Sequence, residues 1–116
     1  MENNDIIGIE NKIGYSFRNK ELLLRAFTHS SYSNEHRNVS SYERLEFLGD
    51  AALGFITALD LYQTYPSYSE GKLSKIRAGT VDRNSIAGVV DEMDIVRYIR
   101  TGSGNAQENF RTSIKA

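Results

Sequence analysis

The middle of the chain holds the pattern that most restricts its fold. Apolar residues recur there at steps of three and four positions, namely Leu45, Leu48, Ala52, Phe55 and Leu59. This periodicity predicts an amphipathic helix with one side facing the protein core. We expect Ser40 and Glu43 to form a capping box at its start, and Pro66 to end it after Tyr65.

Acidic residues occupy one stripe of this predicted helix. Glu46 lies three residues after Glu43, and Asp50 four residues after Glu46, so all three should project from the same face. Between Glu46 and Asp60 there is no lysine or arginine, so the basic partners expected of a solvated, salt-bridged helix are missing. Clustered carboxylates suit hard cations such as Mg²⁺, which indicates phosphodiester chemistry. The alternative is a distant arginine beside Glu43, an exposed Glu46, and an Asp50 bonded to a backbone amide.

Three motifs, in consistent order, resemble the ribonuclease III family. Residues 43–51, Glu-Arg-Leu-Glu-Phe-Leu-Gly-Asp-Ala, match the family signature. Residues 22–32 resemble its leucine-rich helix, which ends in a Thr-His-Ser-Ser-Tyr turn, and residues 70–78 resemble its Glu-Gly-x-Leu-Ser-x-x-Arg-Ala segment. The resemblance extends from about residue 14 to residue 77, and more weakly to 114. Its motifs are specific enough to make chance similarity a poor explanation.

The resemblance implies an all-α, ribonuclease III endonuclease-domain fold and an activity. Such a domain works as a homodimer in the cytoplasm and cuts double-stranded RNA, as in the processing of ribosomal RNA, leaving short 3′ overhangs. It implies that Glu46 and Asp50 are catalytic Mg²⁺ ligands, with Glu43 and Glu70 as further acids at the metal site and Mn²⁺ as a substitute ion. The ions would activate a bound water and offset charge on the phosphate.

Other residues within the motifs have two interpretations each. Phe47 beside the acids could pack in the core, or, by the resemblance, could insert into a pocket of the partner subunit. Arg77, Lys72 and Arg44 could contact RNA phosphates, or could belong to an ordinary solvated face. His29 at the end of an apolar helix is expected to be a structural hydrogen-bonding residue, rather than a general base or a metal ligand.

Two glycines in the signature helix also carry an expectation. Gly49 and Gly54 each weaken a helix by about 1 kcal/mol relative to alanine. Their presence suggests that another helix approaches closely at these points, and a role in a dimer seam is our hypothesis.

The end of the chain departs from the family pattern. Residues 111–116 resemble the approach to a segment that supplies a further Asp and Glu, and the 116-residue sequence stops there. We therefore expect residues 1–116 to be one C-terminally incomplete endonuclease domain, without a double-stranded-RNA-binding domain. The alternative is a non-catalytic domain that serves dimerisation or RNA binding.

Composition sets wider limits. The formal net charge is -1, so no global basic field attracts nucleic acid, and RNA contacts must come from local patches. The absence of cysteine excludes disulfides and thiolate chemistry. No apolar run approaches the roughly 20 residues that cross a bilayer, so we expect a soluble protein without a membrane partner. Further helices are expected at about residues 5–12, through residue 27 with Asn19 as N-cap, over residues 70–80 with Ser69 as N-cap, from Asp82 or Asn84 through residue 91, and at about residues 94–100.

Overall fold

The computed structural model describes residues 3–103, which form helices joined by short loops. In chain order the elements are α1 (Asn3–Ile13), α2 (Lys20–Ala26), α3 (Ser30–Glu35), α4 (Glu43–Thr64), α5 (Glu70–Thr80), α6 (Arg83–Glu92) and the 3-10 helix η1 (Val96–Tyr98). Over this range the β structure is one isolated bridge between Thr28 and Arg100. The predicted all-α class is confirmed.

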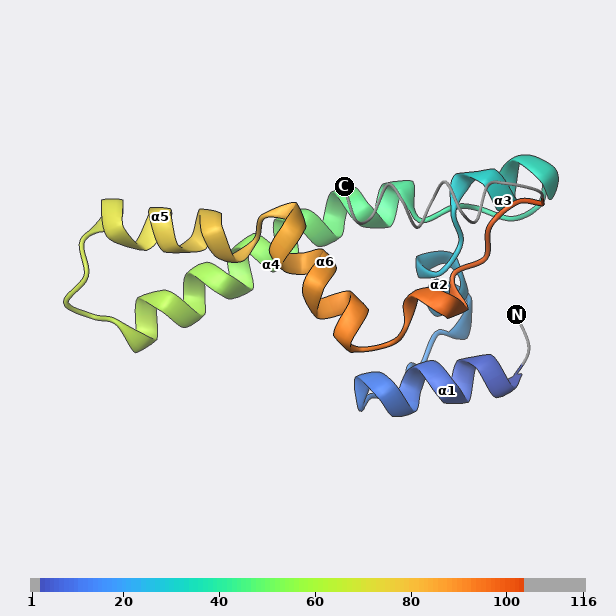
Figure 1. Ribbon diagram of the computed structural model, residues 1–116, viewed down its shortest axis with the longest axis horizontal. Coiled ribbons are helices and arrows are strands. Elements are labelled where there is room, and N and C mark those ends of the chain that lie inside the picture. The colour runs from blue at the N-terminus through green and yellow to red at the C-terminus, as the bar shows by residue number, and fades with distance from the viewer. Residues whose placement is uncertain (1–2, 104–116) are drawn as a thin grey trace.

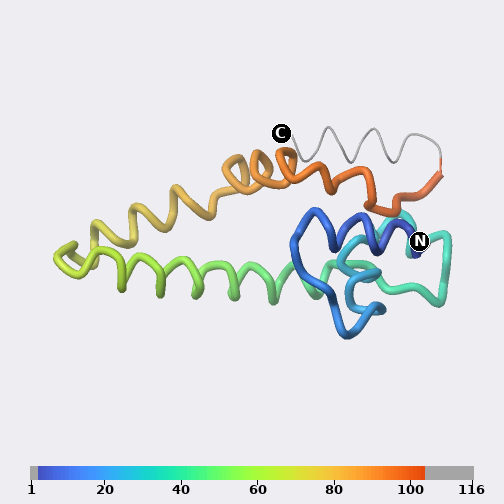
Figure 2. Tube along the Cα trace, turned by 90° about the horizontal axis from the view of Figure 1, so that it is seen from below, coloured from blue at the N-terminus to red at the C-terminus, as the bar shows by residue number. Residues whose placement is uncertain are grey.

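The helices form a head and an arm. Helices α1, α2 and α3 gather at one end with η1, and α4 runs from this head along the arm, where α5 returns beside it (Figure 1). The side view shows how α6 then leads the chain back toward the head (Figure 2). The whole measures 50 × 31 × 24 Å, so the arm accounts for much of the longest dimension.

The core of the head lies between α1 and α2. Ile9, Leu23 and Phe27 are buried there, and partly buried residues pack around them: Ile6, Ile13, Phe17, Ile95, Tyr98 and Ile99. A Cβ added at Gly8 would collide with the Tyr98 hydroxyl, so glycine permits the close packing of α1 against η1.

Polar contacts also tie α1 to its neighbours. Glu10 accepts hydrogen bonds from the Lys20 ammonium, at 2.6 Å, and from the Phe17 amide, at 2.6 Å. These two bonds lower the pKa of the Glu10 carboxyl, the lysine having the larger effect. Lys12 pairs with Asp94 at 2.9 Å, which links α1 to the loop after α6.

Several helix starts agree with the sequence. The side chains of Asn19, Ser69 and Asp82 each accept a hydrogen bond from the backbone amide three residues later, at 2.9–3.2 Å. Pro66 follows the end of α4 at Thr64 as expected. These N-caps satisfy amides that have no partner inside the helix.

The predicted capping box of the signature helix is wrong. Tyr42 is the N-cap of α4 and makes no side-chain cap bond. The Glu43 amide instead donates to the Ser41 hydroxyl at 3.3 Å. The chain is held at this point by its backbone, because the Tyr42 amide donates to the Thr28 carbonyl at 2.9 Å.

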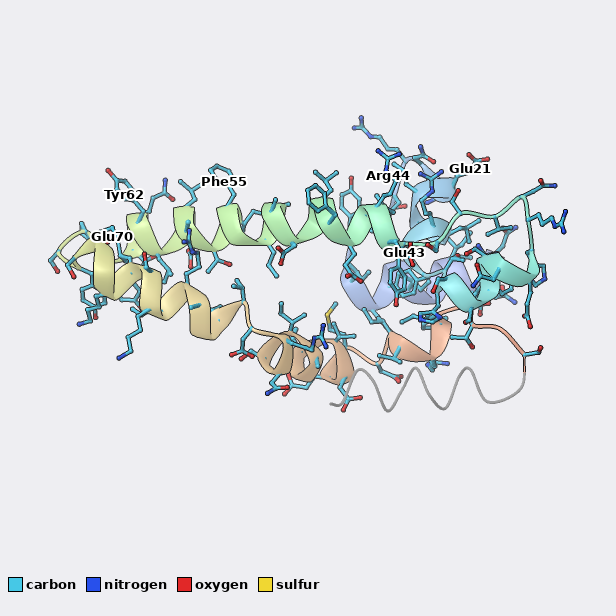
Figure 3. The ribbon with its side chains drawn as sticks, turned by 90° about the horizontal axis from the view of Figure 1, so that it is seen from above. Glu21, Glu43, Arg44, Phe55, Tyr62 and Glu70 are labelled. Carbon is cyan, nitrogen blue, oxygen red and sulfur yellow. The ribbon has the colours of Figure 1, made fainter. Side chains whose placement is uncertain are left out.

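The predicted core-facing stripe of α4 is also wrong in the single chain. Leu48 is 63% exposed, Phe55 67% and Leu59 44%. Phe47, at 83% exposed, is not a core residue either. Phe55 and Tyr62 point away from α5 in Figure 3. The reason is tertiary: α5 packs on another side of α4, and among the described residues of the stripe Leu45 alone lines the hollow that faces α6.

The two glycines of α4 follow the same pattern. A Cβ added at Gly49 or Gly54 would meet no other atom within 4 Å among the described residues. The expected close approach of a helix therefore does not occur within the described part of this chain.

Within residues 3–103, none of the helices combines the length and the apolar character needed to traverse a bilayer.

Candidate active site

A groove lies between the first turns of α4 and the facing side of α6. It has a volume of about 650 Å³. Most of its wall is apolar, formed by Ala26, Leu45, Val81, Ile86, Ala87, Val90 and Ile99. Five polar side chains complete the lining: Glu46, Asp50, His29, Tyr42 and Arg83. The groove thus places a few polar groups against an apolar wall, which is typical of ligand sites.

Glu46 and Asp50 supply the negative charge of the groove. They lie four residues apart on α4, so their side chains are neighbours on successive turns. Neither carboxylate forms a salt bridge with a lysine or arginine within residues 3–103. Their local environment therefore leaves both acids able to bind an external cation. Two carboxylates are a donor set that fits Mg²⁺, whose remaining ligands are commonly waters and phosphate oxygens.

Tyr42 lines the groove together with the two acids. Burial raises the pKa of its phenol above the usual 10.0, and the charges of Glu46 and then Glu43 raise it further. The phenol therefore stays protonated at neutral pH and remains a hydrogen-bond donor. The Tyr42 carbonyl also accepts the Glu46 amide at 2.7 Å, which fixes the first turn of α4.

His29 has the structural role that the sequence predicted. Its Nδ1 accepts the Ser31 amide at 3.1 Å and lies 2.7 Å from the Ser31 hydroxyl, so it caps α3. Its ring meets that of Tyr42 edge-to-face, with 5.9 Å between the centroids. The imidazole also lines the groove, so its capping bond fixes its orientation near the acids.

The other two predicted metal ligands lie elsewhere. Glu43 is exposed at the start of α4 and does not line the groove. Glu70 begins α5 at the far end of the arm, where it accepts a bond from Ser74 at 2.9 Å (Figure 3). Across residues 3–103, no three His, Asp or Glu side chains group closely enough to hold a metal ion together. The chain therefore brings together two of the four predicted acids.

Comparison with known proteins assigns the family. A family model for ribonuclease-III-like proteins matches residues 19–116. The chain belongs to the ribonuclease-III-like family. Relatives named ribonuclease 3 are 48% identical over 94 residues in Symbiobacterium thermophilum and 46% identical over 105 residues in Streptococcus thermophilus. These matches include 81% and 89% of this chain but 40% and 46% of the relatives, so the chain spans less than half of their length.

Solved structures agree on the fold of this ribonuclease-III-like chain. The nuclease domain of ribonuclease III from Campylobacter jejuni matches with a TM-score of 0.80 and 31% identity, over 96% of this chain and 73% of that one. That structure concerns flexibility in a region involved in dimer formation. A second structure of the same domain matches with a TM-score of 0.80 over 100% of this chain. The predicted ribonuclease III nuclease-domain fold is confirmed.

The basic residues predicted to bind RNA are dispersed in the ribonuclease-III-like chain. Arg44 is exposed in the first turn of α4, near the head (Figure 3). Lys72 lies on α5 with its ammonium 3.8 Å from the centre of the Tyr68 ring. Arg77 lies one turn and a half further along α5, in a hollow that also includes Glu70. Their roles in RNA binding stay predictions.

Sequence reasoning missed two polar residues of the groove. Tyr42 directly precedes the signature, so its position next to Glu43 was a usable signal. No sequence signal pointed to Arg83, because only the position of α6 opposite α4 brings this residue to the groove. The predicted approach to a second acidic segment, at residues 111–116, lies outside the described residues.

Proposed function

We propose that this chain is the catalytic part of a Mg²⁺-dependent endoribonuclease that cuts double-stranded RNA. The observation that carries the proposal is the pair Glu46 and Asp50, two carboxylates on successive turns that share one groove and have no basic partner within residues 3–103. Membership of the ribonuclease-III-like family supports it independently.

The two acids would hold Mg²⁺ in the groove that they line. When bound, the ion supplies an activated water and offsets the charge that develops on the phosphate. The other contributions come from side chains that line the groove. Tyr42 stays a neutral donor beside the carboxylates, and Arg83 brings a positive charge to the opposite wall.

The exposed face of α4 supports a homodimer as part of this proposal. Four large side chains on this face are more than 60% exposed: Phe47, Leu48, Phe55 and Tyr62. Large exposed apolar surfaces on soluble proteins mark interaction sites. We assign this face to a second copy of the chain, with Phe47 as its anchor and Gly54, two turns further along the same face, at a point where two helices could approach closely. Glu43 and Glu70 could then act in a groove shared by two subunits.

The proposal includes the setting of the reaction. Mn²⁺ should replace Mg²⁺, because oxygen ligands suit both ions. A cytoplasmic role in RNA processing, such as the maturation of ribosomal RNA, fits the relatives named ribonuclease 3.

A second candidate is a non-catalytic domain for dimerisation or RNA binding. The observation in its favour is that only two acids meet in the groove among the residues described. In that case the groove would bind an ion without turning over a substrate.

Cleavage of defined nucleic acids separates the two candidates. The natural full-length translation product is incubated with a perfect RNA duplex, its single strands, or the matching DNA duplex. We expect cutting of duplex RNA alone, with Mg²⁺ or Mn²⁺, and none after chelation by EDTA. Intact binding of the RNA duplex without cutting in either ion would support the non-catalytic candidate and overturn the nuclease.

A further inference from the structure

Arg100 joins two segments of the head that lie far apart in the sequence, the segment after η1 and the segment after α2. Its backbone pairs with the segment after α2, donating to the Phe27 carbonyl at 2.7 Å and accepting the His29 amide at 2.9 Å. Its guanidinium donates to the Thr28 hydroxyl from Nη2 at 2.7 Å and from Nε at 3.1 Å. It also lies 4.6 Å from the centre of the Tyr32 ring. Within residues 3–103 it forms no salt bridge, so its contacts are with a hydroxyl and an aromatic face.

Thr28 is the point on which these contacts converge. Its side chain is completely buried, and its hydroxyl donates to the Leu24 carbonyl at 2.6 Å while it accepts from Arg100. Its own carbonyl accepts the Tyr42 amide at 2.9 Å. A buried polar residue with all of its groups bonded resists displacement, because moving it leaves unsatisfied donors and acceptors.

A further hydrogen bond connects Tyr42 to Glu46, and both residues line the groove. The Tyr42 carbonyl accepts the Glu46 amide at 2.7 Å in the first turn of α4. Arg100, Thr28, Tyr42 and Glu46 are therefore linked in series, although Arg100 itself does not line the groove. This is notable because α4 has no side-chain cap of its own to define where it starts.

We propose that Arg100 is a positioning residue that, through Thr28, fixes the first turn of α4 and so the carboxylate of Glu46 beside Asp50. Its importance for metal binding rests on the proposed function, whereas its hold on α4 does not. Lysine cannot replace it, because a single ammonium on a flexible stem cannot make both bonds to the Thr28 hydroxyl and cover the Tyr32 ring in a fixed geometry.

Amide hydrogen exchange, measured without metal, tests the hold on α4. In Arg100→Lys we expect the amides of Tyr42 and Glu46 to exchange about tenfold faster or more, while the core amide of Leu23 changes little. Arg97→Lys is the matched control, because Arg97 also contacts a tyrosine ring, at 4.5 Å, but is exposed three residues earlier. Unchanged exchange at Tyr42 in Arg100→Lys would overturn the proposal.

Thr28→Val provides the second variant. It keeps the volume of the side chain and removes the hydroxyl, so it should accelerate the same two amides. Combined with Arg100→Lys it should add little, because both changes break one connection. A uniform rise in exchange across the head in both variants, or additive effects of the two, would contradict positioning and show general stabilisation instead.

Titration with Mn²⁺ alone tests the consequence for the groove. We expect the midpoint of binding to rise about tenfold in Arg100→Lys, the scale for residues that support metal ligands, and to stay unchanged in Arg97→Lys. Faster exchange at Tyr42 with an unchanged Mn²⁺ midpoint would refute the link to Glu46. If the wild type binds no Mn²⁺, the proposed function fails, while the exchange experiment still decides whether Arg100 holds α4.

Discussion

Asp50→Asn should abolish cleavage of duplex RNA, lowering the rate by about a hundredfold or more, the scale seen when one charge-stabilising group is removed from an active site. The amide keeps the shape of the side chain but removes the charge that would bind the metal. Because α4 is already formed and Asp50 is exposed, the fold should be unaffected. Cleavage is measured in single-turnover assays with Mg²⁺, and duplex binding by gel retardation.

Asp60→Asn is the control for this substitution. Asp60 is an exposed aspartate on the same helix but does not line the groove. Its replacement should leave cleavage within about twofold, since substitutions away from a structural or functional feature have small effects. Full activity of Asp50→Asn would refute the site assignment, and equal losses in both variants would point to the charge of the helix rather than to a metal ligand.

Phe47→Ala should dissociate the proposed homodimer. Phe47 is 83% exposed in the single chain, and its burial in a partner would make it the type of aromatic anchor that dominates interfaces. Loss of such an anchor costs about 2 kcal/mol or more, which corresponds to about a thirtyfold weaker dimer. Sedimentation equilibrium of wild type and variant over a range of concentrations measures the change.

Tyr15→Ala is a suitable comparison for Phe47→Ala. Tyr15 is another exposed aromatic, at 56%, but it lies after α1 and packs edge-to-face on Phe17. We expect the dimer to survive this change. A wild type that stays monomeric at high concentration, or a Phe47→Ala variant that dimerises normally, would show that the apolar face of α4 has another use.

Local features of the fold were predictable from the sequence. The caps at Asn19, Ser69 and Asp82 depend on residues three positions apart, so their chemistry can be recognised in the linear chain. The closeness of Glu46 to Asp50 can be predicted in the same way, because the two residues are four positions apart on one helix. Helix α3 was missed because Ser30–Glu35 has no apolar periodicity and begins at the unusual cap His29.

Features that depend on distant segments were not predictable. The apolar stripe of α4 indicated a core, but whether another helix covers it is decided by tertiary packing. Glu70 was grouped with the other acids by resemblance, yet the turn at Pro66 places it at the far end of the arm from Glu43 (Figure 3). The approach of Arg83 to the groove and of Arg100 to Thr28 joins residues more than 30 positions apart, which no local pattern records.

Mn²⁺ binding to the two acids tests the account most directly, because paramagnetic Mn²⁺ can be followed without any RNA. We predict that the wild type binds Mn²⁺ competitively with Mg²⁺, that Glu46→Gln and Asp50→Asn each weaken binding by about tenfold or more, and that Asp60→Asn does not. Equal binding by wild type, Glu46→Gln and Asp50→Asn would contradict a metal site in the groove of α4.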